Sequence, residues 1–87
     1  MNKDMSTIKA EVRGFVVKNF LFGQEDGLQD DASLLEQGIM DSTGVLELVA
    51  FLEKELGVKV EDTELVPENL DSVEAIAAFV ARKRGGR

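Results

Sequence analysis

Asp41 and Ser42 stand where a predicted loop becomes a helix, and they are the residues of this chain best placed to do chemistry. The first N–H groups of a helix have no intrahelical partner, and the helix dipole places partial positive charge at the same end. A serine hydroxyl in that position suits a covalently attached phosphate, whose charge these groups would stabilise. We therefore take Ser42 as a candidate attachment site and Asp41 as the residue that can cap the helix.

Ser42 is expected to be a substrate and not a catalyst. Serine is a weak nucleophile unless a base activates it, and the chain contains no histidine and no cysteine. The same absence removes disulfides, thiolate nucleophiles and the usual zinc ligands. A calcium-binding loop fails on spacing, because aligning Gly27 as the loop glycine puts Phe22 at its first position. We expect neither an enzyme nor a metal site.

Charge is distributed unevenly along the chain. Residues 19–81 hold 15 acidic side chains against two basic ones, Lys54 and Lys59, so this segment has a net charge of −13 while the whole chain has −7. So negative a surface repels nucleic acid and anionic membranes and attracts basic protein patches. The alternative is that the acidic faces only keep a small protein soluble.

The elements that must position Ser42 are helices. Apolar spacing predicts a first helix over about Ser6 to Leu21 and a second from Asp41 to Leu56, which Gly57 ends. The long connection from Gly23 to Asp41 is expected to be fastened to the core by apolar residues, namely Leu28, Leu34, Leu35 and Ile39. The second helix should bury Val45, Leu48, Val49, Leu52 and Leu56.

Two more helices complete the predicted fold. A short turn is expected from Asp62 to Val66, before Pro67. The last helix should open near Asp71 or Ser72, with Asp71 and Glu74 at capping-box spacing. It should bury Val73, Ile76, Ala77 and Val80. The prediction is an all-α fold, a small four-helix bundle with three longer helices, one short helix and a long first loop.

Domain organisation and location follow from length and hydropathy. The 87 residues predict a single domain, 1–87, with flexible tails at 1–5 and 84–87. No stretch approaches the roughly 20 apolar residues of a membrane span, and the N-terminus lacks the order of a secretory signal. We expect a cytoplasmic monomer.

In this context the chain resembles the acyl carrier protein family over nearly its whole length. The resemblance is clearest in residues 33–42, which run from Ser33-Leu34-Leu35 to Asp41-Ser42, followed by Leu48 and the Glu-rich turn from Glu53 to Glu55. It implies that Ser42 receives 4′-phosphopantetheine from coenzyme A, whose thiol then holds an acyl or aminoacyl group as a thioester. It also gives Asp41 a place in transferase recognition or metal contact.

The partners that this resemblance implies are enzymes with basic docking patches. They include a phosphopantetheinyl transferase, which must supply the activating base and Mg²⁺, an acyl or aminoacyl activating ligase, and acyl transferases. The partner-binding surface is expected on the outer side of the second helix, where charge would set encounter rate and apolar groups would make the dry contact. Its residues are Thr43, Leu46, Glu47, Ala50 and Glu53.

Departures from the family pattern favour a specialised carrier over that of general fatty acid synthesis. Thr43 stands where a leucine is frequent, and Gly44 where an acidic side chain is usual in fatty acid carriers, while Lys54 interrupts the carboxylates. The chain would then serve a dedicated activating enzyme in fatty acid or secondary metabolite biosynthesis.

Two other classes of protein share single features with this chain. Arg84-Gly85-Gly86 could suggest a ubiquitin-like modifier, but such proteins need several alternating strands, and this chain has helical periodicity throughout. The second is an acidic helical adaptor that binds a basic partner without being modified. Intact mass separates this adaptor from a carrier, because only a carrier gains phosphopantetheine.

Overall fold

The computed structural model describes residues 5–21, 23 and 28–85, and within these ranges it consists of helices without strands. The expected class, a small helical bundle with a long first loop, is confirmed. Its elements in chain order are α1 (Met5–Phe20), α2 (Ser42–Glu55), the 3-10 turn η1 (Asp62–Glu64), α3 (Pro67–Leu70) and α4 (Val73–Gly85).

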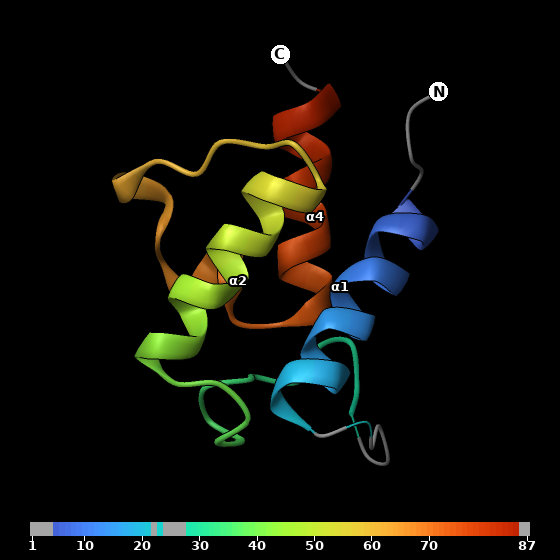
Figure 1. Ribbon diagram of the computed structural model, residues 1–87, viewed down its shortest axis with the longest axis vertical. Coiled ribbons are helices and arrows are strands. Elements are labelled where there is room, and N and C mark those ends of the chain that lie inside the picture. The colour runs from blue at the N-terminus through green and yellow to red at the C-terminus, as the bar shows by residue number, and fades with distance from the viewer. Residues whose placement is uncertain (1–4, 22, 24–27, 86–87) are drawn as a thin grey trace.

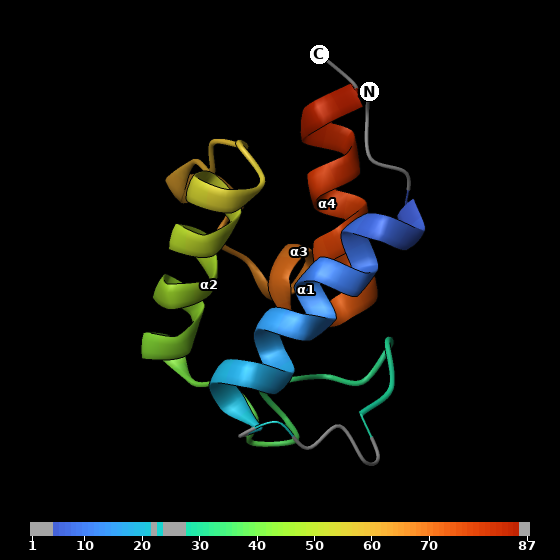
Figure 2. The same cartoon turned by 45° about the vertical axis from the view of Figure 1, so that its right-hand side comes forward.

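The three longer helices form a bundle in which α1 and α4 are the closest pair. These two make most of the contacts between longer helices, and α2 touches α1 at far fewer places. In Figure 1, α1 runs downward while α2 and α4 run upward. The start of α2 therefore lies at one end of the molecule, and the start of α1 and the finish of α4 lie toward the other, as Figure 2 also shows.

The core is built from the apolar stripes that the sequence predicts. Ile8, Val12 and Val16 of α1 are at most 2% exposed, and they recur every fourth residue on one face. The four predicted core residues of α4, Val73, Ile76, Ala77 and Val80, are fully inaccessible. Burying each large apolar side chain contributes about 1.5–3 kcal/mol, so these stripes fix how α1 and α4 pack.

The second helix follows its prediction closely at both ends. Leu48 and Leu52 are fully buried and Leu56 nearly so, whereas Val45 and Val49 are half-buried against the core. Leu56 caps the helix, and Gly57 follows in the left-handed region with φ +71°. The next N–H, that of Val58, donates to Leu52 O over 3.3 Å, and the buried Val58 side chain supplies the apolar contact of such caps.

The short helical region differs from the prediction. The expected turn at Asp62–Val66 is a 3-10 turn over Asp62–Glu64, and a separate helix, α3, begins at Pro67 itself. Proline suits the first helical position, because its missing N–H would have no intrahelical partner there. Pro67 therefore starts a helix in this fold, where the sequence pattern indicated an end.

The first loop is fastened to the core as expected, except at one residue. Leu28 and Leu34 are buried and Ile39 packs against the core, but Leu35 is 40% exposed, so its prediction as a core residue was wrong. A polar clamp adds to these contacts. The Arg13 guanidinium donates to Leu28 O over 2.7 Å and to the Asp30 carboxylate over 2.8 Å.

The two predicted tails fall largely outside the described residues. Of the expected tail residues, Met5 belongs to α1 and Arg84 and Gly85 belong to α4, while 1–4 and 86–87 are not described. Among the described helices, none has the length and apolar character needed to cross a bilayer.

Candidate functional site

Ser42 is the first residue of α2, and it is exposed. Asp41 precedes it in extended conformation, with φ −114° and ψ −171°, and caps the helix. Its carboxylate accepts the N–H of Gly44 over 2.8 Å, and its carbonyl accepts the N–H of Val45 over 2.9 Å. The predicted capping role of Asp41 is confirmed, and the cap fixes the turn from which the Ser42 hydroxyl projects.

The chain itself offers no imidazole to activate the Ser42 hydroxyl. The chain has no histidine, and the described residues include no group of three or more carboxylates placed to hold a metal ion. The N–H groups of Ser42 and Thr43 belong to the first turn, where the helix supplies no acceptor. The arrangement therefore suits a hydroxyl that another protein modifies, with the helix end ready to stabilise a phosphate.

A mainly apolar pocket of about 190 Å³ opens beside Ser42. Ser42 lines it together with residues of the first loop, of α2, of the segment before α3 and of α3 itself, among them Leu35, Met40, Val45, Leu65 and Leu70. Its lining includes two exposed leucines, Leu35, 40% exposed, and Leu65, 38% exposed. The Ser42 hydroxyl therefore lies beside an apolar surface that is partly exposed to water.

One margin of this pocket is held by Asp71, which is a correction to the sequence analysis. The Asp71 carboxylate accepts hydrogen bonds from the Ser33 hydroxyl and, over 2.9 Å, from the N–H of Leu35, and its carbonyl accepts the N–H of Leu34 over 2.7 Å. It therefore fastens the first loop and makes no capping box with Glu74. The capping oxygen of α4 belongs to Ser72, whose hydroxyl accepts the N–H of Ala75 over 3.0 Å.

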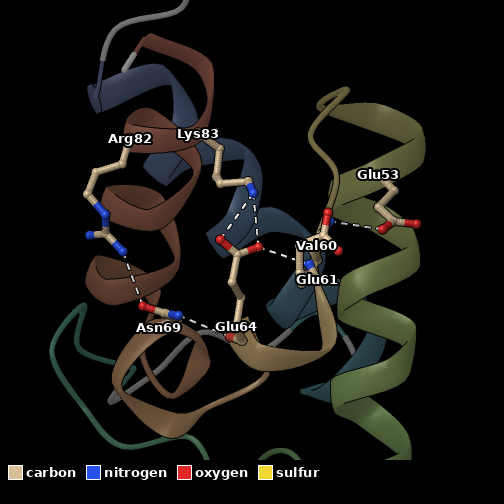
Figure 3. A network of polar contacts seen from close by, with 7 residues as sticks. All are labelled: Glu53, Val60, Glu61, Glu64, Asn69, Arg82 and Lys83. Carbon is tan, nitrogen blue, oxygen red and sulfur yellow. Dashed lines mark hydrogen bonds and ion pairs between the residues drawn. The ribbon is translucent and has the colours of Figure 1, made fainter. Parts of the chain in front are cut away.

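A polar network surrounds Glu64, the residue before the pocket-lining Leu65 (Figure 3). The Glu64 carboxylate accepts two hydrogen bonds from the Lys83 ammonium, at 2.9 and 3.1 Å, and one from the N–H of Glu61 at 2.9 Å. The Asn69 amide donates to Glu64 O over 3.0 Å. These contacts tie η1 to α3 and α4, and Leu65 follows directly on the tied residue.

The same contacts explain the one clear shift in acidity among the described residues. The N–H of Glu61 and, after it, the Lys83 ammonium lower the pKa of the Glu64 carboxyl from its usual 4.5, because both stabilise the ionised form. The ion pair is partly exposed, with 26% exposure on each side chain, so solvent screens it.

Glu53 takes part in this network from α2, as Figure 3 shows. Its carboxylate accepts the N–H of Val60 over 3.0 Å, which ties the segment after α2 back onto that helix. A role for Glu53 in stabilising the fold was not anticipated, because the spacing of Glu53 alone indicated only an exposed face.

The predicted partner surface is exposed along α2. Leu46, at 64%, is the most exposed large apolar side chain among the described residues. Its neighbours on the same outer face are exposed as well, namely Thr43, Glu47, Ala50 and Glu53. The positions agree with the predicted exposure, and the partner role stays a prediction.

The sequence analysis did not identify Leu65 and Pro67 as part of the site. Both line the pocket beside Ser42, although they lie more than 20 residues away along the chain. The only signal in the sequence is an apolar pair, Leu65 and Val66, between acidic residues and directly before Pro67. An isolated apolar pair of this kind often marks a surface contact, but it gives no indication of which residue lies opposite.

Comparison with known proteins gives a consistent result. Residues 21–80 match the model of the phosphopantetheine attachment site family. A relative from Serratia sp. (strain ATCC 39006), the probable acyl carrier protein PigG, is 32% identical over 75 residues, which cover 86% of each chain. In a solved structure described as the crystal structure of an FAD-dependent dehydrogenase, one chain is 33% identical with a TM-score of 0.71; the match covers 79% of this chain and 97% of that one.

The site fits the prosthetic group of this family. An exposed hydroxyl at a helix N-terminus can be joined to a phosphate, and the apolar pocket beside it offers contact to an attached arm. Proteins of this family are carriers and not catalysts, and they bear covalent 4′-phosphopantetheine. They work together with a phosphopantetheinyl transferase and with biosynthetic enzymes. By its sequence and its fold, this chain is a member of the acyl carrier protein family.

Proposed function

We propose that Ser42 is the residue that bears 4′-phosphopantetheine, and that the chain holds acyl or aminoacyl groups as thioesters for partner enzymes. The observation that carries this proposal is the exposure of the Ser42 hydroxyl at the capped start of α2. Attachment forms a phosphoester bond at Ser42 Oγ and releases adenosine 3′,5′-bisphosphate from coenzyme A. The hydroxyl proton passes to a base of the transferase, since the chain has no histidine to accept it.

Intact-mass measurement tests the attachment site. The chain is incubated with coenzyme A, Mg²⁺ and a phosphopantetheinyl transferase, and the wild type should gain one phosphopantetheine group. Ser42→Ala should gain none, while Thr43→Ala, which removes the neighbouring exposed hydroxyl, should be modified like the wild type. Labelling of Ser42→Ala would refute the assignment. A wild type of unchanged mass would support the alternative, an acidic adaptor that is never modified.

We propose further that the partners dock on the outer face of α2 through basic patches. Leu46 offers the dry contact, and the nearby carboxylates of Asp41 and Glu47 are exposed and form no ion pair within the described part of the chain. Charge in this arrangement raises the encounter rate and excludes acidic partners, while Leu46 sets how long the complex lasts. The expected partners are a transferase, an acyl or aminoacyl activating ligase and acyl transferases.

A flavin-dependent dehydrogenase is proposed as an additional partner. The support is the similarity to a chain in the solved structure of an FAD-dependent dehydrogenase. A thioester makes the C–H next to its carbonyl acidic, so a base of the dehydrogenase can take that proton while the C–H of the following carbon passes a hydride to the oxidised flavin. The acyl group is left with a double bond between these two carbons, and the flavin becomes reduced. Mixing the dehydrogenase of that structure with aminoacyl-loaded carrier under anaerobic conditions should bleach the oxidised flavin absorbance. Unloaded carrier is the control, and equal absorbance in both samples would contradict the proposal.

A further inference from the structure

Gly44, in the first turn of α2, is a buried glycine with no room for a side chain. A Cβ added there would lie 2.9 Å from Met40 Cγ and 2.9 Å from Phe20 Cε1, closer than real Cβ contacts. At Gly14, Gly23, Gly38 and Gly57, in contrast, an added Cβ would have no heavy atom within 4 Å. Gly44 has no positive φ, so close packing and not backbone conformation requires glycine here.

The ring that fills this space belongs to a row of aromatic contacts between α1 and α2. Phe20, the last residue of α1, meets Phe15 edge-on with ring centroids 5.7 Å apart. Phe15 in turn stacks on Phe51 of α2 at 4.4 Å. The contact of Phe15 with Phe51 and the seating of Phe20 against Gly44 both join α1 to α2.

The second contact falls on the turn that carries Ser42. Met40 is 3% exposed and lies against Gly44, and it also lines the pocket beside Ser42. On the backbone side, the Asp41 carboxylate holds the Gly44 N–H. The first turn is thus fixed from the α1 side by packing against Phe20 and from within by the Asp41 cap.

We infer that Gly44 is a positioning residue for the modification of Ser42. Its missing side chain makes a seat for Phe20, and this seat sets the orientation of the first turn and hence the direction in which the Ser42 hydroxyl is presented to the transferase. The inference rests on the proposed attachment at Ser42. It also means that position 44 cannot offer a transferase an acidic side chain, because any side chain there meets Phe20 and Met40 before it reaches solvent.

Steady-state kinetics of phosphopantetheine transfer test the seat. Gly44→Ala should lower kcat about tenfold or more, since misplacing a reacting group by about 1 Å can cost on the order of 100-fold. KM should change less than about twofold, because the exposed face of α2 is intact. Phe20→Leu combined with Gly44→Ala should restore part of kcat, since the shorter side chain lacks the ring atoms that the new Cβ meets. The matched control is Gly14→Ala on α1, where an added Cβ meets nothing and kcat should stay unchanged.

Gly44→Asp separates the seat from charge. If position 44 lacks only a recognition charge, Gly44→Asp should be modified faster than the wild type, and that result would overturn the inference. If position 44 is a seat, Gly44→Asp should be slowed at least as much as Gly44→Ala. Circular dichroism at the assay temperature gives the folded fraction of each variant, and a loss of kcat no larger than the loss of folded protein would also overturn it.

Amide hydrogen exchange supplies a readout that needs no modification at all. The amides of residues 44 and 45, held by Asp41 at 2.8 and 2.9 Å, should exchange faster in Gly44→Ala and recover protection when Phe20→Leu is added. Unchanged exchange would overturn the seat whatever the kinetics show. If exchange behaves as expected but the wild type is never modified at Ser42, the attachment proposal fails while the packing role of Gly44 stands.

Discussion

Replacing Asp71 by alanine should destabilise the fold more than removing the cap of α4. The change deletes a carboxylate that accepts hydrogen bonds from the Ser33 hydroxyl and the Leu35 N–H, 38 and 36 residues away. Hydrogen bonds to charged groups contribute about 1.5–3 kcal/mol each, and those of Asp71 lie at the low end because Leu35 is exposed to water. Two such bonds give an expected loss of about 3 kcal/mol in the free energy of unfolding, or a Tm lowered by roughly 12–24 °C.

Urea denaturation followed by far-ultraviolet circular dichroism measures this loss. Ser72→Ala is the matched control, since it removes the capping oxygen of α4, and it should cost about 1 kcal/mol. Asp71→Asn should fall between Asp71→Ala and the wild type, because asparagine keeps an acceptor for Leu35 but loses the charge. Were Asp71 a helix cap, asparagine would serve as well as aspartate, so wild-type stability in Asp71→Asn would refute the reasoning.

A double-mutant cycle locates the energy in the long-range contact. Ser33→Ala and Asp71→Ala should couple by about 0.5 kcal/mol or more, because each removes the same hydrogen bond. Strictly additive losses would show that the two residues act independently, and the assignment of Asp71 to the first loop would then be wrong.

The remaining predictions concern the network at η1 and the outer face of α2. Lys83→Met should destabilise the protein at pH 7. The difference in stability from the wild type should shrink as the pH falls below about 4.5 and through the lowered pKa of Glu64, since protonation removes the charge that Lys83 stabilises. Urea titrations at pH 7 and below the lowered pKa check this, and a difference independent of pH would contradict it. Leu46→Ala should raise KM for a partner enzyme about tenfold, while its stability stays within about 0.5 kcal/mol of the wild type. Glu53→Ala should in addition lose up to about 1 kcal/mol of stability, because it removes the hydrogen bond to Val60. Equal stability of the two variants would refute the structural role of Glu53.

Helix positions were predictable because they depend on short-range periodicity. Each end of the first helix was predicted one residue too late in the chain. The second helix stops at Leu56 as predicted, with Gly57 in the expected conformation. Apolar residues at intervals of three and four, together with a C-terminal glycine, contain this information within a single helix.

Long-range fastening was not predictable in the same way. Asp71 lies three residues before Glu74, and that spacing alone fits a capping box, but its carboxylate bonds to Ser33 instead. From the sequence, Gly44 indicates only the lack of an acidic side chain. The structure shows that Phe20 occupies the space that a side chain at position 44 would need. In both cases the residue that determines the role, Ser33 for Asp71 and Phe20 for Gly44, is more than 20 residues away along the chain. A single sequence does not indicate which distant residue comes into contact.

The site itself was predicted in part. The exposure and placement of Ser42 and the cap at Asp41 follow from local pattern, and the structure bears both out. The pocket could not be foreseen, because Leu35 was expected in the core and Leu65 has no regular spacing with any other apolar residue. Its margins depend on where two loops come to lie, which the ties through Asp71 and Glu64 determine.

The opposed ends of the molecule have a practical consequence. α1 begins and α4 finishes toward one end of the molecule, and α2, whose first residue is Ser42, begins at the other (Figure 1). An affinity tag, a fluorescent label or a solid support placed near the start of α1 or the finish of α4 would be distant from the start of α2 and would leave the hydroxyl free to meet enzymes in solution. Immobilised through its C-terminus, this carrier could be passed from one enzyme bath to the next and loaded, processed and unloaded in sequence.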